Sequence, residues 1–462
     1  MKKVLVINPP NMPFTRQSLL IEPIDVLSVA TFIQSLGNKV KVIDMDVKMM
    51  KPKDIQNHIL EFAPSIIVII FDYHIPLHTT ESIPGINEIS GIAQDNGIKV
   101  IMGGKTSNCY PKEFLQNSAD IVIHGEMEPA LSELFLPEEW SQESLSKILG
   151  ISYKIGKRIY STEKRIEKID LDSLPMPDRS LIDLADYIEV RTILSSRGCF
   201  GRCKFCATPL FWGNFRARSA KNVADEIEYL IKTYSARKIL FLDDNATASK
   251  TRMHDISLEI IKRKIKCRFG CLGTISTFDI DTMKIMKKAG FEWIHYGAES
   301  GSIKALTCQN KGISPEDIKR VIKQTKKIGL RVRASFILDL PEIDEKGMRD
   351  TIKLILDSKP DEIRAHFLAI RVGTEYHRTS VHKTIPSQYI HNNKSTNNLS
   401  LMPKESILSY VDELSQKLVK KGYLLINNIS EWDDIKKLKQ KNPDLKFISF
   451  CPARYGLGWG DS

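Results

Sequence analysis

The sequence reads Ser195-Ser196-Arg197-Gly198-Cys199-Phe200-Gly201-Arg202-Cys203-Lys204-Phe205-Cys206 directly after the short apolar run Thr192-Ile193-Leu194. Such a run predicts a strand, so the three cysteines fall on a strand-to-loop junction, where one loop can turn all three thiolates to the same side. Iron–sulfur clusters are normally held by four cysteines. Three cysteines at the spacing CxxxCxxC therefore predict a cluster with one iron open to a small molecule. The alternatives are a zinc site, which needs a fourth ligand, and a loop without metal.

The same stretch resembles the signature of the radical S-adenosylmethionine enzymes, in which an aromatic residue, here Phe205, directly precedes the last cysteine. The flanking runs Ser196 to Cys199 and Arg216 to Ser219 resemble the branch whose radical domain follows a cobalamin-binding domain. The resemblance extends from Met1 to about Tyr376. It implies that Cys199, Cys203 and Cys206 bind a 4Fe-4S cluster. It also implies that the open iron binds S-adenosylmethionine, which one electron cleaves to a 5'-deoxyadenosyl radical.

The composition fits this interpretation. A chain of 462 residues, 42% hydrophobic and 27% charged, predicts two or three globular domains. Eight cysteines without a secretory segment indicate a reducing, cytoplasmic location. The longest apolar run, Ile66 to Phe71, is too short to span a membrane. The net charge of +11 could indicate an anionic partner, but lysines spread singly along helical faces favour a solvated surface over a nucleic-acid interface.

Residues 1–135 alternate short apolar strands with helices, as in a parallel doubly wound sheet. The expected strands are Val4–Ile7, Val40–Ile43, Ile66–Ile70, Lys99–Met102 and Ile121–Ile123. Ligands of such sheets bind beyond the carboxyl ends of the strands, which selects Asn8-Pro9-Pro10, Phe71-Asp72, Gly103 to Asn108 and His124-Gly125-Glu126. Glycines let the backbone approach a ligand closely, and the hydroxyls of Thr106 and Ser107 can donate hydrogen bonds to it. The alternative for Gly103-Gly104 is a simple structural turn.

These loops, together with Glu22-Pro23-Ile24, resemble in order and spacing the cobalamin-binding domain of the same branch. The resemblance implies that cobalamin is bound by Asn8, Pro9, Gly103, Gly104, Thr106, Ser107, His124, Gly125 and Glu126. Two features depart from the family. An Asp-x-His-x-x-Gly motif is absent from the sequence, so His74, His78 and His124 are not placed to be a lower axial ligand, and Lys105 stands where a small or aromatic residue is usual. A vestigial cofactor site is the alternative.

Residues 136–190 read as a proline-punctuated linker that contains a strand pair, Ile151–Tyr153 and Arg158–Tyr160, turning at Gly156. Strand–helix alternation then resumes over residues 191–376. The expected strands are Thr192–Leu194, Lys238–Leu242, Cys267–Cys271, Trp293–Tyr296, Arg331–Ile337 and Glu362–Ala369, with helices such as Asn222–Thr233, Asp281–Ala289 and Pro315–Ile328. Six such units fit the partial (β/α)6 barrel that the resemblance implies, with its chemistry at the carboxyl ends of the strands.

The expected strand ends carry further candidate ligands of the cluster or of S-adenosylmethionine. In the family, the Gly-x-Glu-Ser position of Glu299 and Ser300 binds the ribose or the methionyl ammonium. The helix-cap alternative applies more naturally to Ser300 or Ser302. Arg333 and Ser335 are candidates for the methionyl carboxylate, although Arg333 could equally form a structural ion pair with Glu299 or Asp243. The full set of candidates is Phe205, Asp243, Glu299, Ser300, Arg333 and Ser335.

Residues 377–462 are expected to form a small α-rich extension, with helices at Pro403–Lys421 and Ile435–Lys441. The apolar and aromatic end, Ile448 to Trp459, is unlike a frayed terminus and predicts a segment that folds over the barrel mouth. Its Cys451 is the candidate catalytic residue, as a substrate ligand, a hydrogen-atom donor or a fourth cluster ligand. The alternative is a buried structural thiol.

The resemblance thus implies an α/β protein, with an N-terminal Rossmann-like cobalamin-binding domain, a partial TIM-type radical barrel and the small extension. It implies a cobalamin-dependent radical methyltransferase that acts on an unactivated carbon or phosphorus of a small-molecule or peptide natural product. A protein such as flavodoxin or ferredoxin would donate electrons to the cluster. A second hypothesis is 3-amino-3-carboxypropyl transfer or a rearrangement, with a vestigial or non-methylating cobalamin domain. A third is a sensor that binds nucleic acid through its basic surface.

Overall fold

The computed structural model describes residues 1–10, 21–73, 82–368, 370–379, 400–426, 441–442 and 444–449. These residues divide into two compact units. Unit 1 contains the described residues of Met1–Ile188, Leu210–Trp212 and Arg371–Ile390, and unit 2 those of Glu189–Pro209, Gly213–Ile370 and His391–Ser462. None of the helices in the described ranges combines the length and the apolar character that a membrane span requires.

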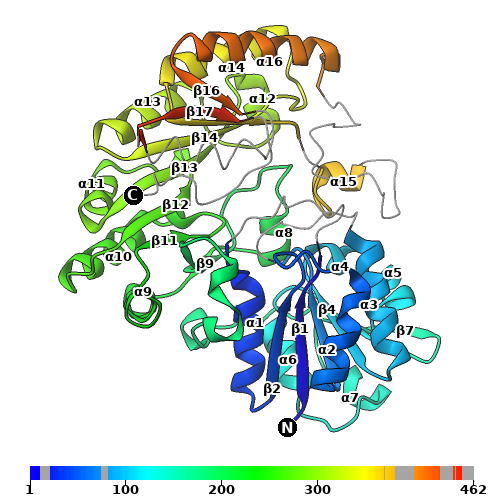
Figure 1. Cartoon of the computed structure of the whole chain (residues 1–462). Helices are drawn as coiled ribbons and strands as arrows, with labels where there is room; N and C mark the ends of the chain where they lie inside the picture. Colours follow the sequence, from blue (N-terminus) through cyan, green and yellow to red (C-terminus); the bar gives the residue numbers. More distant parts are fainter. Residues whose placement is uncertain are drawn as a thin grey trace. The chain divides into compact units, whose positions relative to one another are not determined.

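Unit 1 is built on one sheet, which has seven strands in the described part of the chain, in the order β2-β1-β3-β4-β5-β6-β7 (Figure 1). The strands are β1 (Lys3–Asn8), β2 (Lys39–Asp44), β3 (Ile66–Ile70), β4 (Lys99–Gly103), β5 (Ile121–Ile123), β6 (Ile151–Ile155) and β7 (Arg158–Ser161). The first five are parallel. The chain winds outward in both directions from β1, so the carboxyl ends of β1 and β3 flank the crevice where doubly wound sheets bind ligands.

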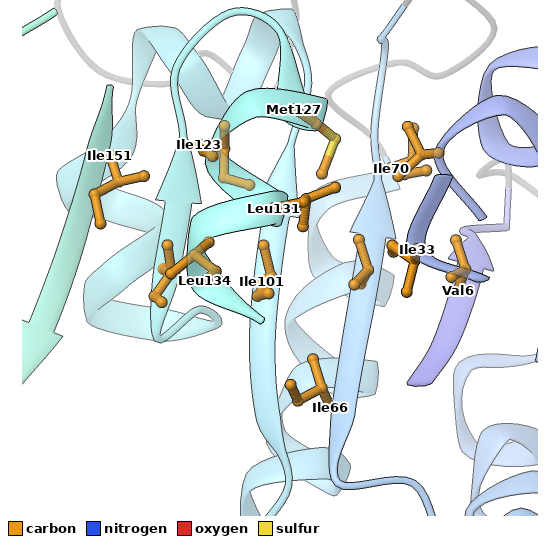
Figure 2. Close-up of a cluster of buried hydrophobic side chains, with 14 of the residues drawn as sticks. Val6, Ile33, Ile66, Ile70, Ile101, Ile123, Met127, Leu131, Leu134 and Ile151 are labelled. Atoms are coloured by element: carbon orange, nitrogen blue, oxygen red, sulfur yellow. The ribbon is translucent and has the colours of Figure 1, made fainter. Parts of the chain in front are cut away.

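Helices cover both faces of this sheet. Unit 1 contains α1 (Ile24–Ser35), α2 (Ile55–Phe62), α3 (Ile83–Asp95), α4 (Lys105–Cys109), α5 (Pro111–Asn117), α6 (Met127–Leu134), α7 (Gln142–Ser146) and α15 (Glu375–Thr379), and α8 (Thr208–Trp212) straddles the boundary between the units. Figure 2 shows Met127, Leu131 and Leu134 of α6 lying over the strand residues Ile101 and Ile123. Helices α2, α3 and α5 cover the opposite face. Because side chains alternate along a strand, both faces are apolar, and the predicted doubly wound domain is confirmed.

The predicted hairpin in residues 136–190 is present as β6 and β7, with the rings of Tyr153 and Tyr160 stacked 5.4 Å apart. Strand β6 pairs antiparallel with β5, Ile151 opposite Ile123, and so continues the first sheet. The residues assigned to a linker therefore belong to unit 1, whose first continuous stretch ends at Ile188 rather than at residue 135. Proline spacing marks chain turns but does not reveal strand pairing.

Unit 2 is built on a parallel sheet in which six successive strands, β8 and β11 to β15, are neighbours in chain order, as in a barrel. Its strands are β8 (Arg191–Ile193), β11 (Lys238–Phe241), β12 (Arg268–Gly273), β13 (Phe291–Glu299), β14 (Arg331–Ile337), β15 (Glu362–His366), β16 (Tyr423–Ile426) and β17 (Lys446–Ser449), and the short pair β9 (Ser196–Arg197) and β10 (Arg216–Ala217) lies apart. The predicted partial barrel is confirmed. The C-terminal extension adds β17 and β16 beside β15, so its described residues are not only helical.

The helices of unit 2 are α9 (Ala220–Tyr234), α10 (Lys250–Lys262), α11 (Ile280–Ala289), α12 (Ile303–Cys308), α13 (Pro315–Lys327), α14 (Glu345–Ser358) and α16 (Lys404–Val419). Single 3-10 turns occur in the two units at Pro52–Asp54, Leu171–Ser173, Arg179–Leu181, Leu184–Asp186, Ala246–Ala248 and Ile275–Thr277. Ser219, Ser249, Asp279, Ser302, Ser314 and Asp344 cap the first turns of α9 to α14 through side-chain oxygens that accept backbone N–H groups. Each cap replaces a hydrogen bond that the helix start lacks.

Candidate cluster and cofactor sites

The three motif cysteines lie on the loop between β9 and α8, and all three are free thiols. The loop turns tightly, because the amide of Cys206 donates to the carbonyl of Cys203 at 3.0 Å. The amide of Gly201 donates to Cys199 Sγ at 3.4 Å. A methyl group on Gly201 would lie 3.5 Å from Cys199 Sγ and 3.9 Å from Cys203 Sγ, so these two sulfur atoms flank the glycine. The thiols are also close enough to interact electrostatically.

The three free thiols have the chemistry of iron–sulfur cluster ligands. A zinc ion would draw thiolates to about 2.3 Å from one centre. A cluster takes each thiolate on a different iron and so spreads its ligands further. Thiolate sulfur is the usual ligand of iron–sulfur clusters, and three such groups on one loop match that chemistry.

Asp243, Asp244 and Asn245 follow β11 and contact the cluster loop, which is the segment 198–207 between β9 and α8, or the residues beside it. The Asp243 carboxylate, which is fully buried, accepts the amides of Ser195 at 2.6 Å and Ser196 at 2.8 Å, and also the Ser195 hydroxyl. Asp244 accepts the hydroxyl of Thr208 at 2.8 Å on the far side of the motif. Asn245 Nδ2 lies 3.7 Å from Cys199 Sγ. Asp243 therefore anchors the two serines that lead into the loop, and its predicted contact with a cofactor stays a prediction.

Glu299, the last residue of β13, stands beside the cluster loop in a strained conformation with φ of +65°. The register of β13 against β14 shifts between Gly297 and Glu299. A methyl group at position 297 would lie 2.3 Å from Glu299 Oε1, so glycine leaves the space that this carboxylate occupies. The Glu299 carboxylate accepts a hydrogen bond from Lys311 Nζ at 2.7 Å, and both side chains are nearly buried.

Lys311 was not among the residues singled out from the sequence. Its ammonium interacts electrostatically with Cys203 and Cys206 and lies 5.9 Å from the ring centroid of Phe205. Burial would by itself lower the pKa of Lys311, but the interactions with Glu299, Cys203 and Cys206 raise it above its usual value overall. A lysine twelve residues beyond Glu299 carries no pattern in the sequence, so only the fold identifies it.

The turn that carries Lys311 also grips the cluster loop. The carbonyl of Gln309 accepts the amide of Lys204 at 3.2 Å, and Asn310 Nδ2 donates to the carbonyl of Arg202 at 3.2 Å. The structure thus brings Phe205 and Glu299 together through Lys311. Ser300 instead faces α14, where its hydroxyl lies 3.1 Å from Thr351 Oγ1, and its role toward a cofactor stays a prediction. Ser302 is the helix cap, as the alternative proposed.

Arg333 and Ser335 lie deeper along the barrel strands than Glu299. Glu299 is in register with Phe336, whereas Arg333 is opposite His295, about 10 Å further down β14. Arg333 pairs with Glu362 at 2.6–2.7 Å and stacks on the Trp293 ring at 4.8 Å. Its ion-pair partner is therefore neither Glu299 nor Asp243.

Ser335 Oγ shares a hydrogen bond of 2.5 Å with His295 Nε2. Ser335 therefore contacts the same histidine that lies opposite Arg333 in the sheet. The predicted contacts of Arg333 and Ser335 with the methionyl carboxylate stay predictions.

We expect His295 to make unit 2 sensitive to acid. Burial and the guanidiniums of Arg333 and Arg364 hold its pKa well below the usual value. Below about pH 6.5 the unfolded chain therefore takes up a proton at His295 that the folded chain does not. The contribution of His295 to the free energy of unfolding is constant above that pH and falls below it. The loss between pH 6.5 and 5.5 is about 1 kcal/mol.

Denaturant unfolding of the wild type and H295Q at both pH values measures this loss. H295Q should remove that part of the pH dependence. H254Q, which changes a histidine with a 41% exposed side chain, should keep it. An equal pH dependence in H295Q and the wild type would contradict the assignment.

In unit 1, the neighbouring loop at Phe71 requires glycine at position 104, directly after β4. Gly104 has φ of +138°, and a methyl group there would lie 1.6 Å from the carbonyl oxygen of Phe71. The amide of Lys105 donates to the carbonyl of Asp72 at 3.0 Å, and Thr106 Oγ1 donates to the Asp72 carboxylate at 3.3 Å. Gly103 packs closely against Met127, and Ser107 Oγ donates to the carbonyl of Gly104 at 3.1 Å. The loops after β3 and β4 therefore pack directly against each other.

The remaining unit 1 candidates lie at strand ends of the same sheet. Asn8, followed by Pro9, donates to Asp44 at 2.8 Å across the ends of β1 and β2. Both ring nitrogens of His124 are engaged, Nδ1 with Asn108 at 3.2 Å and Nε2 with Ser152 at 2.7 Å, and burial lowers its pKa. Gly125 has a positive φ, and Glu126 precedes α6. The structure thus gathers these candidates at the carboxyl end of the sheet, in the loops after β1, β4 and β5, and their contacts with cobalamin stay predictions.

Lys105, which departs from the family pattern, is buried in unit 1. Its ammonium donates to the carbonyl of Tyr73 and lies 5.4 Å from the Phe211 ring centroid. It therefore supports the loop that follows β3. Cys451, His74 and His78 lie outside the described residues, as do the predicted helix Ile435–Lys441, apart from its last residue, and the segment beyond β17.

Comparison with known proteins separates the two halves in the same way. The B12 binding domain model matches residues 18–135, and the Radical SAM superfamily model matches residues 193–355, which include the three cysteines and Glu299. A relative named as an uncharacterised methyltransferase from Pyrococcus horikoshii is 26% identical over 91% of this chain and 92% of its own length.

Two solved structures share the fold. TsrM from Kitasatospora setae, a radical S-adenosylmethionine methyltransferase solved with tryptophan and an S-adenosylmethionine analogue, has a TM-score of 0.67 at 16% identity. The match covers 79% of this chain and 73% of TsrM. OxsB, a cobalamin-dependent S-adenosylmethionine radical enzyme, has a TM-score of 0.65 at 18% identity, covering 77% of this chain and 52% of OxsB.

Proposed function

Because the chain belongs to the radical S-adenosylmethionine enzymes that carry a B12-binding domain, we propose that it methylates an unactivated carbon or a phosphorus of a small-molecule or peptide substrate. It is a cobalamin-dependent enzyme of the methyltransferase type, and its cofactors are a 4Fe-4S cluster, S-adenosylmethionine and cobalamin. The relative from Pyrococcus and TsrM are both named methyltransferases. Methyl transfer is therefore favoured over 3-amino-3-carboxypropyl transfer and over rearrangement.

The observation that carries the proposal is the set of three free thiols on one loop, with Glu299 and Lys311 beside it, in a chain that also has the glycine-lined edge of unit 1. Cys199, Cys203 and Cys206 would hold the cluster. The loops after β3 and β4, which Gly104 allows to pack against each other at Phe71, would line the cobalamin site. When bound, the cluster supplies the electron that cleaves S-adenosylmethionine, and the cobalamin carries the methyl group.

The protein's own groups then have two tasks. Asp243 and the turn at Gln309–Lys311 hold the cluster loop at both sides. Glu299 presents a carboxylate that can accept hydrogen bonds from an ammonium or from ribose hydroxyls. A low-potential one-electron donor such as flavodoxin or ferredoxin is the expected partner. We place the enzyme in a reducing, cytoplasmic location, since all seven cysteines in the described part of the chain are free thiols.

Anaerobic purification with added cobalamin, followed by cluster reconstitution and product analysis, tests the proposal. Methyl transfer should release S-adenosylhomocysteine and 5'-deoxyadenosine. Aminocarboxypropyl transfer would release methylthioadenosine instead, and a rearrangement would release no S-adenosylhomocysteine. The proposal fails if the reconstituted protein binds no cobalamin and transfers no label from methyl-labelled S-adenosylmethionine.

A further inference from the structure

Lys311 and Glu299 form an ion pair that is almost buried beside the cluster loop. The side chain of Lys311 is 12% exposed and that of Glu299 is 9% exposed, and they are joined at 2.7 Å. Removing two charges from water is unfavourable, and the attraction between them offsets that cost only in good geometry. A pair of apolar side chains would fill the same place without that cost. The position of the pair, rather than its contribution to stability, therefore calls for an explanation.

Both charges act on the cluster cysteines. The thiol of Cys203 interacts electrostatically with the ammonium of Lys311 and, in the opposite sense, with the carboxylate of Glu299. Lys311 also interacts with Cys206. Charges so close to the ligands and so little exposed are weakly screened by solvent and salt.

The pair is held in place by the backbone around it. Glu299 keeps a left-handed conformation, and Gly297 leaves the space that its carboxylate occupies. Lys311 extends from a turn that is hydrogen-bonded to the cluster loop at Lys204 and Arg202. Neither side chain can move far from the cysteines without breaking these contacts, so the two charges act on the cluster site from fixed positions.

We infer that Lys311 and Glu299 set the reduction potential of the cluster, the ammonium raising it and the carboxylate lowering it. Reduction moves one electron from a low-potential donor onto the cluster and makes it more negative, so a nearby cation stabilises the reduced form and an anion destabilises it. Net charge and polar contacts around the sulfur ligands are established controls of such potentials. Lys311 is thus a positioning residue with an electrostatic role. The inference rests on the cluster of the proposed function but not on methyl transfer.

The experiment is an anaerobic redox titration of the reconstituted full chain, monitored by the electron paramagnetic resonance signal of the reduced cluster, without S-adenosylmethionine or substrate. K311M should move the midpoint potential to a more negative value. E299Q should move it to a more positive value. The double variant K311M/E299Q, which removes both charges, should titrate close to the wild type, and K311R should as well.

Matched controls come from a second lysine–glutamate pair in the same unit. Lys304 Nζ lies 2.7 Å from Glu342 Oε2, with side chains 60% and 41% exposed, so K304M and E342Q should leave the potential unchanged. Iron and sulfide are counted first in each variant. If K311M binds less iron than the wild type, the inference is tested by comparing the midpoint potentials of E299Q and E342Q alone. The inference is overturned if a fully loaded K311M titrates as the wild type, or if E299Q shifts the potential in the same direction as K311M or not at all.

Because the measurement needs no turnover, a protein without methyltransferase activity can still support this inference. Conversely, a methyltransferase whose potential ignores both substitutions would refute the inference and leave the proposed function intact.

Discussion

Replacing Cys199, Cys203 and Cys206 together by alanine is expected to reduce bound iron to background and to abolish 5'-deoxyadenosine formation. The three thiols flank a single turn of the loop after β9. Since thiolates are the ligands of iron–sulfur clusters, a loop without them has nothing to hold the irons. Iron and sulfide analysis of the reconstituted protein measures the first effect, and chromatography of the nucleoside product measures the second.

A second triple variant removes the same number of thiols from other places. Cys109, Cys267 and Cys308 are free cysteines outside the motif, so C109A/C267A/C308A should keep its iron. Circular dichroism shows whether each variant is folded. Iron content and deoxyadenosine formation that survive the loss of the three motif cysteines would remove the basis of the proposed function.

Replacing Gly104 by alanine is expected to abolish cobalamin binding and to destabilise unit 1 by roughly 3 kcal/mol. The added methyl group would lie 1.6 Å from the carbonyl oxygen of Phe71, and alanine rarely adopts the φ of +138° that Gly104 has. The loop after β4 must then move away from the loop after β3. Absorption spectroscopy after gel filtration measures the bound cobalamin, and denaturant unfolding measures the free energy.

The matched control is G91A, inside helix α3 of the same unit. A methyl group on Gly91 meets no atom within 4 Å. Alanine is a better helix former than glycine, so G91A should raise the free energy of unfolding by about 0.5–1 kcal/mol and leave cobalamin binding unchanged. Wild-type cobalamin binding in G104A would show that the edge formed by the loops after β3 and β4 is not the cofactor site.

Much of the fold follows from local pattern. Strands β3, β5 and β14 begin and end at the residues that the apolar runs predict, Ile66–Ile70, Ile121–Ile123 and Arg331–Ile337. Helices α11 and α13 differ from their predicted bounds by one residue at one end. Periodicity is a local property, and these segments bury the face that their own sequence defines. The pairing of β6 with β5 and of β17 with β15 was not predicted, because partner choice depends on residues far apart in the chain.

The candidate site residues also fall into those that local sequence reveals and those that only the fold reveals. The sequence by itself predicts the three cysteines as cluster ligands and selects the two glycines, because spacing within one loop and the absence of a side chain are visible in consecutive residues. Only the tertiary structure decided that Asp243 anchors the loop, that Arg333 pairs with Glu362, and that Lys311 meets Glu299 beside Cys203. Each of these contacts joins residues from different strands or turns, and the energy of a charge depends on which distant groups the fold brings within a few ångströms of it.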